Sequence, residues 1–217
     1  MIGSLLENEA FIGAAIGVTG VIIGTLIGAL IPWLKEWLRE KQKRSEHAKY
    51  LAAQLICILD EYIEKCCDVV GDDGSIYGAP SLPDGSYVPQ VATPDLSYPE
   101  DIDWKSIDGN LMYQLLALPN SARKTDRYIG NAADHASPPD YDELFEARWE
   151  GYANLGLKAI DLKEALRTTY KLPDENFDLN PEWNAKKYLE EKLEKIKKTR
   201  ANRAAAFEEM TKKLGTK

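Results

Sequence analysis

The chain has 217 residues, 44% of them apolar and 29% charged, and a net charge of −8 at pH 7. This is the composition of an ordinary globular protein of one or two domains. The acidic excess argues against broad binding of duplex DNA, because such binding depends on neutralising the phosphates. The charges are unevenly distributed. None lies between Ala10 and Leu34, whereas the sequence from Lys35 onward is dense in them.

The uncharged segment predicts a transmembrane helix over residues 10–34, preceded by a short extracytoplasmic N-terminus of residues 1–9. As a helix these 25 residues would extend about 37 Å, slightly more than the hydrocarbon core of a bilayer, which is about 30 Å thick. A buried core helix would normally keep a polar stripe, and here only two threonines interrupt the apolar surface. A cleaved signal peptide would need a basic leader, but the only charges before the segment are Glu7 and Glu9.

The basic residues predict the orientation of this helix. Six Lys or Arg side chains lie within fifteen residues after the segment, and none lies before it. Because the more basic flank stays in the cytoplasm, we expect the N-terminus outside and residues 35–217 inside. Near the inner boundary, the aromatic rings and positive charges of four residues are expected to anchor the helix at the membrane interface: Trp33, Trp37, Lys35 and Arg39.

The cytoplasmic part is predicted to be an all-α bundle of about four helices. The first continues from the membrane helix without Pro or Gly from Trp33 to Val70 and ends at Gly71. Residues 71–100 contain four Gly and five Pro and predict a long loop. Apolar residues spaced by three and four predict three further helices, from Asp103 to Pro119, from Asp140 to Leu172, and from an Asn180–Pro181 start to Leu214.

One segment of the bundle is ambiguous, and the last helix has a predicted inner face. The segment from Asn120 to His135 fits no one element and is left unassigned. In the last helix, five apolar residues are expected to face inward: Leu189, Leu193, Ile196, Phe207 and Met210.

The sequence offers no recognisable catalytic or metal site. It contains no HExxH, GxSxG, GxxxxGK[ST] or GxGxxG motif, and neither of its two histidines has a partner at metal-ligand spacing. We therefore expect no enzymatic activity, no metal and no cofactor. Cys57, Cys66 and Cys67 lack the CxxC spacing and are interpreted as small core residues with reduced thiols. The neighbouring Asp72 and Asp73 are interpreted as a pair that is common in acidic proteins.

One basic cluster stands out in the middle of the chain. Residues 51–180 carry 24 acidic and 10 basic side chains, and among them Arg123, Lys124 and Arg127 fall about one helical turn apart. One interpretation is local charge pairing with Asp126 and its neighbours. The other is contact with an anionic ligand, such as a regulatory nucleotide or oligonucleotide. A regulatory protein partner is also left open.

The membrane segment carries the clearest pattern. Five glycines fall on one stripe, in an arc of about 80° at 100° per residue: Gly13, Gly17, Gly20, Gly24 and Gly28. Small residues on one side let helix backbones approach closely, and this packing drives association within a bilayer. Glycine is also simply common in transmembrane helices. We interpret the stripe as helix-packing or pore-lining in a homo-oligomer, a tetramer or larger if the assembly encloses a pore.

The uncharged span from Ala10 to Leu34, the basic flank from Lys35 to Arg44 and the acidic helical domain together resemble the small membrane effectors of bacterial anti-phage abortive infection, including the Hailong-type membrane effector. The resemblance covers the whole chain as architecture and rests on no specific motif. It implies an oligomer in the bacterial inner membrane that forms or gates an ion-conducting pore, is toxic when released and is controlled by its cytoplasmic domain. The alternative is a membrane-tethered scaffold or adaptor that binds a cytoplasmic partner without channel activity.

Overall fold

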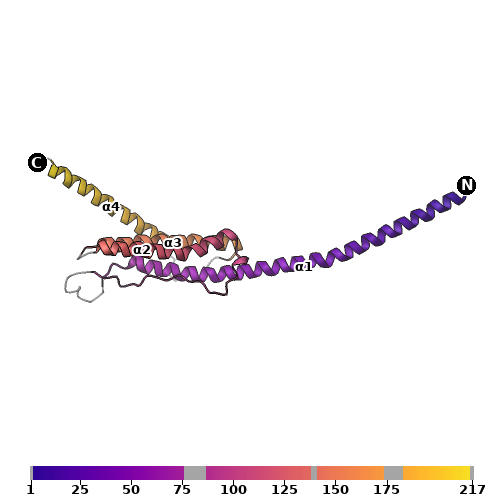
Figure 1. Cartoon of the computed structure of the whole chain (residues 1–217), viewed down its shortest axis with the longest axis horizontal. Helices are drawn as coiled ribbons and strands as arrows, with labels where there is room; N and C mark the ends of the chain where they lie inside the picture. The colour runs from indigo at the N-terminus through magenta and orange to yellow at the C-terminus, as the bar shows by residue number, and fades with distance from the viewer. Residues whose placement is uncertain (1, 76–86, 138–140, 174–182, 216–217) are drawn as a thin grey trace. The chain divides into compact units, whose positions relative to one another are not determined.

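The computed structural model describes residues 2–75, 87–137, 141–173 and 183–215, with side chains at 28 and from 30 to 213 within these ranges. The described residues form four α-helices and one turn of 3-10 helix, and none of them lies in a strand (Figure 1). The elements are α1 (Ile2–Gly71), η1 (Trp104–Ser106), α2 (Gly109–His135), α3 (Asp142–Tyr170) and α4 (Ala185–Gly215). The predicted all-α class is confirmed. The chain divides into two units, Met1–His47 and Ala48–Lys217.

Helix α1 belongs to both units and continues without a break to Gly71, the residue at which the sequence predicts its end. Among the residues whose side chains the structure describes, no helix combines the length and the apolar character needed to cross a membrane.

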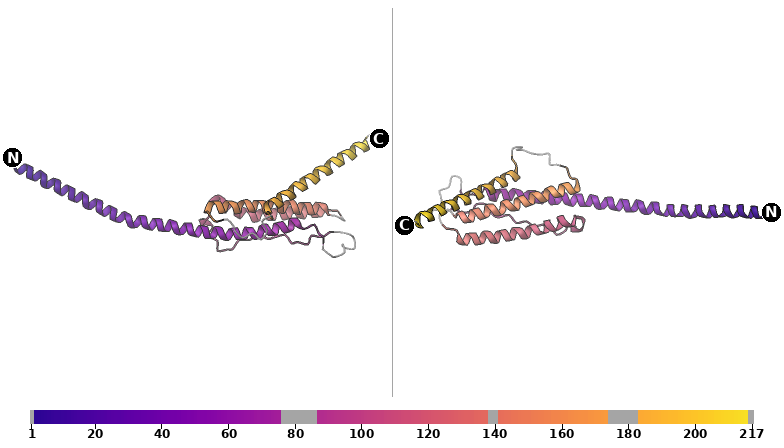
Figure 2. Two further views of the ribbon diagram at one scale, coloured as in Figure 1. Left: turned by 180° about the vertical axis from the view of Figure 1, so that it is seen from behind. Right: turned by 90° about the horizontal axis from the view of Figure 1, so that it is seen from above.

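Helix α3 is the centre of the bundle formed by the second unit. Seen from above, it lies between α2 and α4 (Figure 2). It runs antiparallel to α1, because Asp60 pairs with Lys163 while the later Asp72 pairs with the earlier Arg148. The contacts of α2 and of α4 with α3 also join later residues of one helix to earlier residues of the other. Helices α1, α2 and α4 therefore all run antiparallel to α3.

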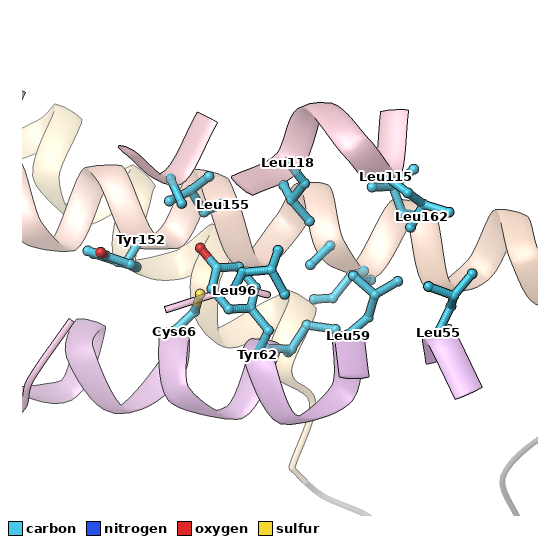
Figure 3. Close-up of a cluster of buried hydrophobic side chains, with 14 of the residues drawn as sticks. Leu55, Leu59, Tyr62, Cys66, Leu96, Leu115, Leu118, Tyr152, Leu155 and Leu162 are labelled. Atoms are coloured by element: carbon cyan, nitrogen blue, oxygen red, sulfur yellow. The ribbon is translucent and has the colours of Figure 1, made fainter. Parts of the chain in front are cut away.

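Apolar residues of α1, α2 and α3 meet in one core, together with the extended segment that precedes η1 (Figure 3). Leucine side chains dominate this core, and burying each contributes about 1.5–3 kcal/mol. Fully buried or nearly so are Leu55, Leu59, Tyr62 and Cys66 on α1, Leu115 and Leu118 on α2, Tyr152, Leu155 and Leu162 on α3, and Leu96 on the extended segment. In the second half of α1 the apolar residues recur every three or four positions, and this stripe is the face that the helix buries.

A glycine on α3 allows three helices to approach closely. A Cβ atom placed on Gly156 would lie 2.7 Å from Cδ1 of Leu189 on α4 and 3.2 Å from Cβ of Cys66 on α1. Both distances are shorter than ordinary van der Waals contact, so a side chain here would require the buried Leu189 side chain to move and Cys66 to shift by a few tenths of an ångström.

The helix that was predicted to end at Pro119 continues through it, so that prediction is wrong and the unassigned residues 120–135 are helical. A proline inside a helix removes the N–H that would bond the carbonyl four residues earlier. Here that carbonyl belongs to Leu115, and the hydroxyl of Tyr98 donates a hydrogen bond to it at 3.0 Å. A group outside the helix therefore replaces the missing backbone donor.

The start of α2 also differs from the prediction. Asp103, the predicted cap, accepts a hydrogen bond from the N–H of Lys105 in η1. Asp108 caps α2 instead, accepting from the N–H groups of Asn110 and Leu111 at 3.0 and 3.1 Å. The predicted starts at Asp140 and at Asn180–Pro181 lie outside the described residues.

Helix α4 is held on α3 from Lys186 as far as Arg203. Leu189 and Ile196 are buried and Leu193 is half-buried, as predicted, but Phe207 and Met210 are 70% and 58% exposed, which contradicts their predicted inward position. The reason is the length of α3, which begins at Asp142. Arg203 pairs with Asp142 at 3.8 Å, and α4 then extends beyond the end of its neighbour.

Candidate functional sites

The first candidate site is the exposed apolar face of α1 at the C-terminal end of the predicted membrane span, residues 30–38. Six large apolar side chains here are roughly half exposed or more, and at 100° per residue they fall within an arc of about 160°: Leu30, Ile31, Trp33, Leu34, Trp37 and Leu38. Lys35 and Arg39, one turn apart, lie outside this arc. Lys41 lies over the ring of Trp37, with Nζ 5.2 Å from the ring centroid. The first unit thus presents a helix with one apolar, Trp-bearing face and one charged face.

The glycine stripe belongs to the same helix. Of its members, Gly28 is described with its surroundings, and a Cβ atom placed there would meet nothing within 4 Å. For Gly13, Gly17, Gly20 and Gly24 the structure describes the helical backbone and not the side-chain surroundings, so their packing role stays a prediction.

The predicted basic cluster lies on the outer face of α2. Arg123, Lys124 and Arg127 are all exposed, and none of them forms an ion pair with any residue that the structure describes. Arg123 donates a hydrogen bond to the side-chain oxygen of Asn120. Asp126, the partner expected for local pairing, instead accepts a hydrogen bond from the hydroxyl of Tyr152 at 2.5 Å. The cluster remains available to an anionic partner.

A second arrangement, which the sequence did not reveal, is a buried clamp around Asp72. Three backbone N–H groups donate to its carboxylate, from Gly74 at 3.0 Å, Gln90 at 2.8 Å and Val91 at 2.9 Å. Nη2 of Arg148 lies 3.3 Å from the same carboxylate and donates to the carbonyl of Val91 at 2.7 Å. Asp72 and Arg148 are 7% and 6% exposed, so the pair is shielded from water.

The residue after Arg148 completes the clamp. Nε1 of Trp149 donates to the backbone carbonyl of Asp72 at 2.7 Å, and Nζ of Lys192 on α4 lies 3.6 Å from the centroid of the Trp149 ring. Burial lowers the pKa of Lys192. Gly74 has a φ of +75°, and a Cβ placed on it would lie 2.5 Å from Cζ of Phe145, so both its backbone and its space require glycine.

This clamp fastens the described chain after α1, residues 72–75 and 87–91, to helix α3. The two neighbouring carboxylates thus differ, because Asp72 belongs to a buried ion pair whereas Asp73 is exposed. The sequence does contain one sign of this clamp, a charged residue on an apolar helix face. Arg148 stands between Ala147 and Trp149 on the apolar face of α3. A buried charge needs an opposite charge nearby.

A groove of about 580 Å³ opens beside the clamp. It is lined by carboxylates of Asp68 and Asp73 and by the rings of Trp183 and Tyr188, whose centroids are 5.0 Å apart. No basic residue lines it in the described part of the chain, so it does not suit the anionic ligand expected from the sequence. Among the described residues, no three His, Cys, Asp or Glu side chains come together as metal ligands.

The cysteines divide between core and surface. Cys66 and Cys67 are buried, as predicted, and burial raises the pKa of their thiols to about 12 and about 11. Cys57 is exposed, so the prediction that it is a core residue is wrong. Because neither buried thiol ionises near neutral pH, they serve as small apolar side chains.

No family model, no curated protein and no solved structure matches this chain.

Proposed function

We propose that the chain is a single-pass protein of the bacterial inner membrane, with residues 10–34 across the bilayer and residues 35–217 in the cytoplasm. The observation that carries this proposal is the uncharged segment of residues 10–34 together with the exposed apolar face of residues 30–38, which extends past its end on α1. Water-facing Trp33 and Trp37 would be costly on an isolated helix, whereas aromatic rings are favourable at the headgroup level. Lys35 and Arg39 can extend their charges toward the headgroups from the opposite side.

The activity that we propose is that of an oligomeric membrane effector, which forms or gates an ion-conducting pore and is toxic when released. One helix cannot enclose a pathway, so conduction requires several copies. The glycine stripe would let these helices pack closely or line a narrow constriction. The link to anti-phage defence comes from the resemblance in architecture alone.

The cytoplasmic domain is proposed to control this activity. A regulatory ligand shifts an assembly only if it binds the closed and open arrangements with different affinity. The exposed cluster of Arg123, Lys124 and Arg127 supports an anionic regulator, because none of its charges is neutralised by a described residue.

Overexpression in bacteria with a membrane-potential dye tests the proposal. We expect the full chain to depolarise the membrane before growth stops, and deletion of residues 1–34 to abolish both effects. Charge reversal at Arg123 and Arg127 should shift the toxicity without preventing membrane insertion. If residues 35–217 alone kill cells whose potential is intact, the pore is excluded and another activity must be sought.

The orientation has its own test. A reporter that works only in the periplasm, fused after Lys217, should be silent, while a cytoplasmic reporter at the same position should be active. The reverse result would remove the proposed topology and the control by a cytoplasmic domain.

A second candidate function is a membrane-tethered scaffold or adaptor. The observation that favours it is the free end of α4, where Phe207 and Met210 are exposed beyond the N-terminal end of α3. An adaptor would leave the membrane potential intact at any expression level. Its phenotype would instead depend on residues 204–217, whose deletion leaves the pore proposal unaffected.

A further inference from the structure

The groove beside the clamp places two aromatic rings next to carboxylates. Asp68 lines it from the last turn of α1, Asp73 from the clamp segment, and Trp183 and Tyr188 from the residues around the start of α4. Its volume of about 580 Å³ is within the range of about 300–1,000 Å³ that is usual for sites of small ligands. All of these residues belong to the second unit of the chain.

The two rings form one aromatic wall of the groove. The centroids of Trp183 and Tyr188 lie 5.0 Å apart and the ring planes are tilted by 43°, so the rings pack on each other and no ligand passes between them. Trp183 is 52% exposed, which leaves much of its indole surface open to a ligand. The hydroxyl of Tyr188 lies 3.2 Å from the position that a Cβ of Gly71 would take. Because the face of an aromatic ring carries partial negative charge, this wall favours a cation.

The charges beside the aromatic wall are negative. Asp68 is exposed and forms no ion pair with a residue that the structure describes. Asp73 is also exposed, and its Oδ1 accepts hydrogen bonds from the backbone N–H and the hydroxyl of Ser75, at 2.9 and 2.5 Å. Since this oxygen is occupied, Asp73 offers a ligand its charge more than its hydrogen bonds. Helix α1 ends at Gly71 in the groove, and the carbonyl end of a helix adds partial negative charge.

Two basic residues next to the groove, Arg148 and Lys192, already have partners. Arg148 pairs with the buried Asp72 inside the clamp. Nζ of Lys192 lies over the ring of Trp149, and the charge of Asp73 favours its protonated form. Neither residue lines the groove. The groove therefore attracts a positive charge from solution.

The nature of the walls distinguishes between kinds of cation. A metal ion needs several oxygen, nitrogen or sulfur ligands, and no three suitable side chains come together in the described ranges. A primary ammonium or guanidinium group would lose hydrogen bonds to water when it covered the aromatic wall. A quaternary ammonium group has no N–H to satisfy. Its methyl groups can pack on the rings while the carboxylates balance its charge.

We propose that this groove binds a small, soluble quaternary ammonium compound, with its methyl groups on the ring of Trp183 and its charge balanced by Asp68 and Asp73. The site lies in the second unit alone, and its ligand is of opposite charge to the anionic regulator proposed for the cluster on α2. The proposal goes beyond the membrane activity and does not depend on it.

Titration of the full-length protein with choline tests the site. The protein is kept in a maltoside detergent, which carries no ammonium group, and its five tryptophans are labelled with fluorine for NMR. The resonance of Trp183 is identified by its absence in Trp183→Phe. We expect choline to shift this resonance with a dissociation constant on the order of 1 mM, as suits so small a ligand, and to leave that of Trp104 in place.

A neutral ligand of the same shape isolates the role of charge. In 3,3-dimethylbutan-1-ol a carbon atom replaces the nitrogen of choline, so the methyl groups remain and the positive charge is lost. This alcohol should bind at least about tenfold more weakly than choline, because only the cation is attracted by the rings and the carboxylates. The comparison uses the wild-type protein and is independent of any effect of a substitution on folding.

Substitutions test the contacts by calorimetric titration with choline. Asp68→Asn should weaken binding about three- to tenfold, and Trp183→Leu, which keeps an apolar side chain but removes the ring, should weaken it at least about fivefold. The matched control is Asp101→Asn, the same loss of charge at an exposed residue outside the groove, which should leave the affinity unchanged.

Two results would overturn the proposed site. One is a Trp183 resonance that stays in place at about 100 mM choline, a hundredfold above the expected dissociation constant. The other is equal affinity for choline and its neutral isostere. Much tighter binding to a trimethyllysine peptide or to choline lipids would replace the soluble compound by a protein tail or a lipid headgroup. Depolarisation by the full chain is measured separately, so the pore proposal and this one fail independently.

Discussion

The hydroxyl of Tyr98 donates a hydrogen bond to the carbonyl of Leu115, the group that Pro119 leaves without its helical donor. Tyr98→Phe should therefore lower the free energy of unfolding by about 1–2 kcal/mol, because Leu115 is fully buried and its carbonyl loses a partner. Urea unfolding of the purified chain in detergent measures this change.

A second substitution identifies the cause. In a Pro119→Ala background the N–H of the alanine can bond Leu115, so Tyr98→Phe should cost at least about 0.5 kcal/mol less than in the wild type. Equal costs in the two backgrounds would show that Tyr98 acts through its ring alone, which packs edge-on against Trp104 at 5.3 Å between centroids.

The Asp72–Arg148 clamp should be sensitive to loss of charge. Asp72→Asn leaves the buried guanidinium without its counter-ion, and we expect a loss of about 3–5 kcal/mol in the free energy of unfolding. Asp73→Asn, one residue later but exposed, is the matched control and should change it by less than about 0.5 kcal/mol. Similar effects of the two substitutions would mean that Asp72 is not buried with Arg148 in solution.

Substitution of alanine for a glycine should change the stability of the protein in opposite directions at two positions, one on α3 and one on α2. Gly156→Ala adds a methyl group against Leu189 and Cys66 and should destabilise the bundle by about 1–3 kcal/mol. Gly130→Ala meets nothing within 4 Å and should stabilise α2 by about 0.5–1 kcal/mol. Thermal unfolding followed by circular dichroism measures both, and a stabilising Gly156→Ala would contradict the close approach of the three helices.

The buried thiols predict a loss of stability at high pH. Their pKa rises on folding from the ordinary value of 9.0 to about 12 for Cys66 and about 11 for Cys67, so the folded state favours the neutral thiol. Stability from this source is complete below pH 9 and falls as the pH rises toward 11–12, because the unfolded chain then loses protons more readily. Unfolding measured between pH 7 and 10.5 should show this slope, and Cys66→Ala should reduce it.

A labelling experiment reports on the same thiols. We expect a maleimide to label Cys66 and Cys67 only after the protein is unfolded, because both are buried. Rapid labelling of either in the native protein would show that the α1–α3 contact opens readily.

The glycine stripe predicts the effect of bulky residues within the membrane span. Gly17→Leu, Gly20→Leu and Gly24→Leu together place large side chains where helix backbones are expected to touch, and should disturb the subunit count in detergent. The matched control is the substitution of leucine for Ile12, Ile16 and Ile23, which lie outside the stripe. A normal subunit count and normal toxicity in the glycine variant would reduce the stripe to coincidence.

Local patterns predicted the elements whose determinants are local. The Leu55, Leu59 and Tyr62 stripe marked the buried face of α1, and Gly71 marked its end, because spacing and backbone freedom are properties of neighbouring residues. Pro119 led to a wrong prediction of a helix end, because what allows the helix to continue is not local. The donor that compensates for it comes from Tyr98, in a segment that contains no regular structure and gives no local signal.

The clamp and the end of α4 could not be predicted because each depends on a distant partner. Asp72 resembles any surface carboxylate until Arg148, 76 residues away, is placed beside it. Phe207 and Met210 continue the apolar spacing of α4, but whether they are covered depends on where α3 begins. Neither fact can be read from the few residues around the position.

The central place of α3 also has a consequence for synthesis of the protein. The partner of Asp72 on α3 is made 76 residues later and that of Asp60 103 residues later. At roughly 5–20 residues per second, the apolar stripe of α1 leaves the ribosome some 4–20 s before α3 can cover it. During that interval the nascent chain exposes a leucine-rich amphipathic helix directly behind an uncharged hydrophobic segment, so a ribosome-bound chaperone or targeting factor would meet two adjacent binding segments rather than one.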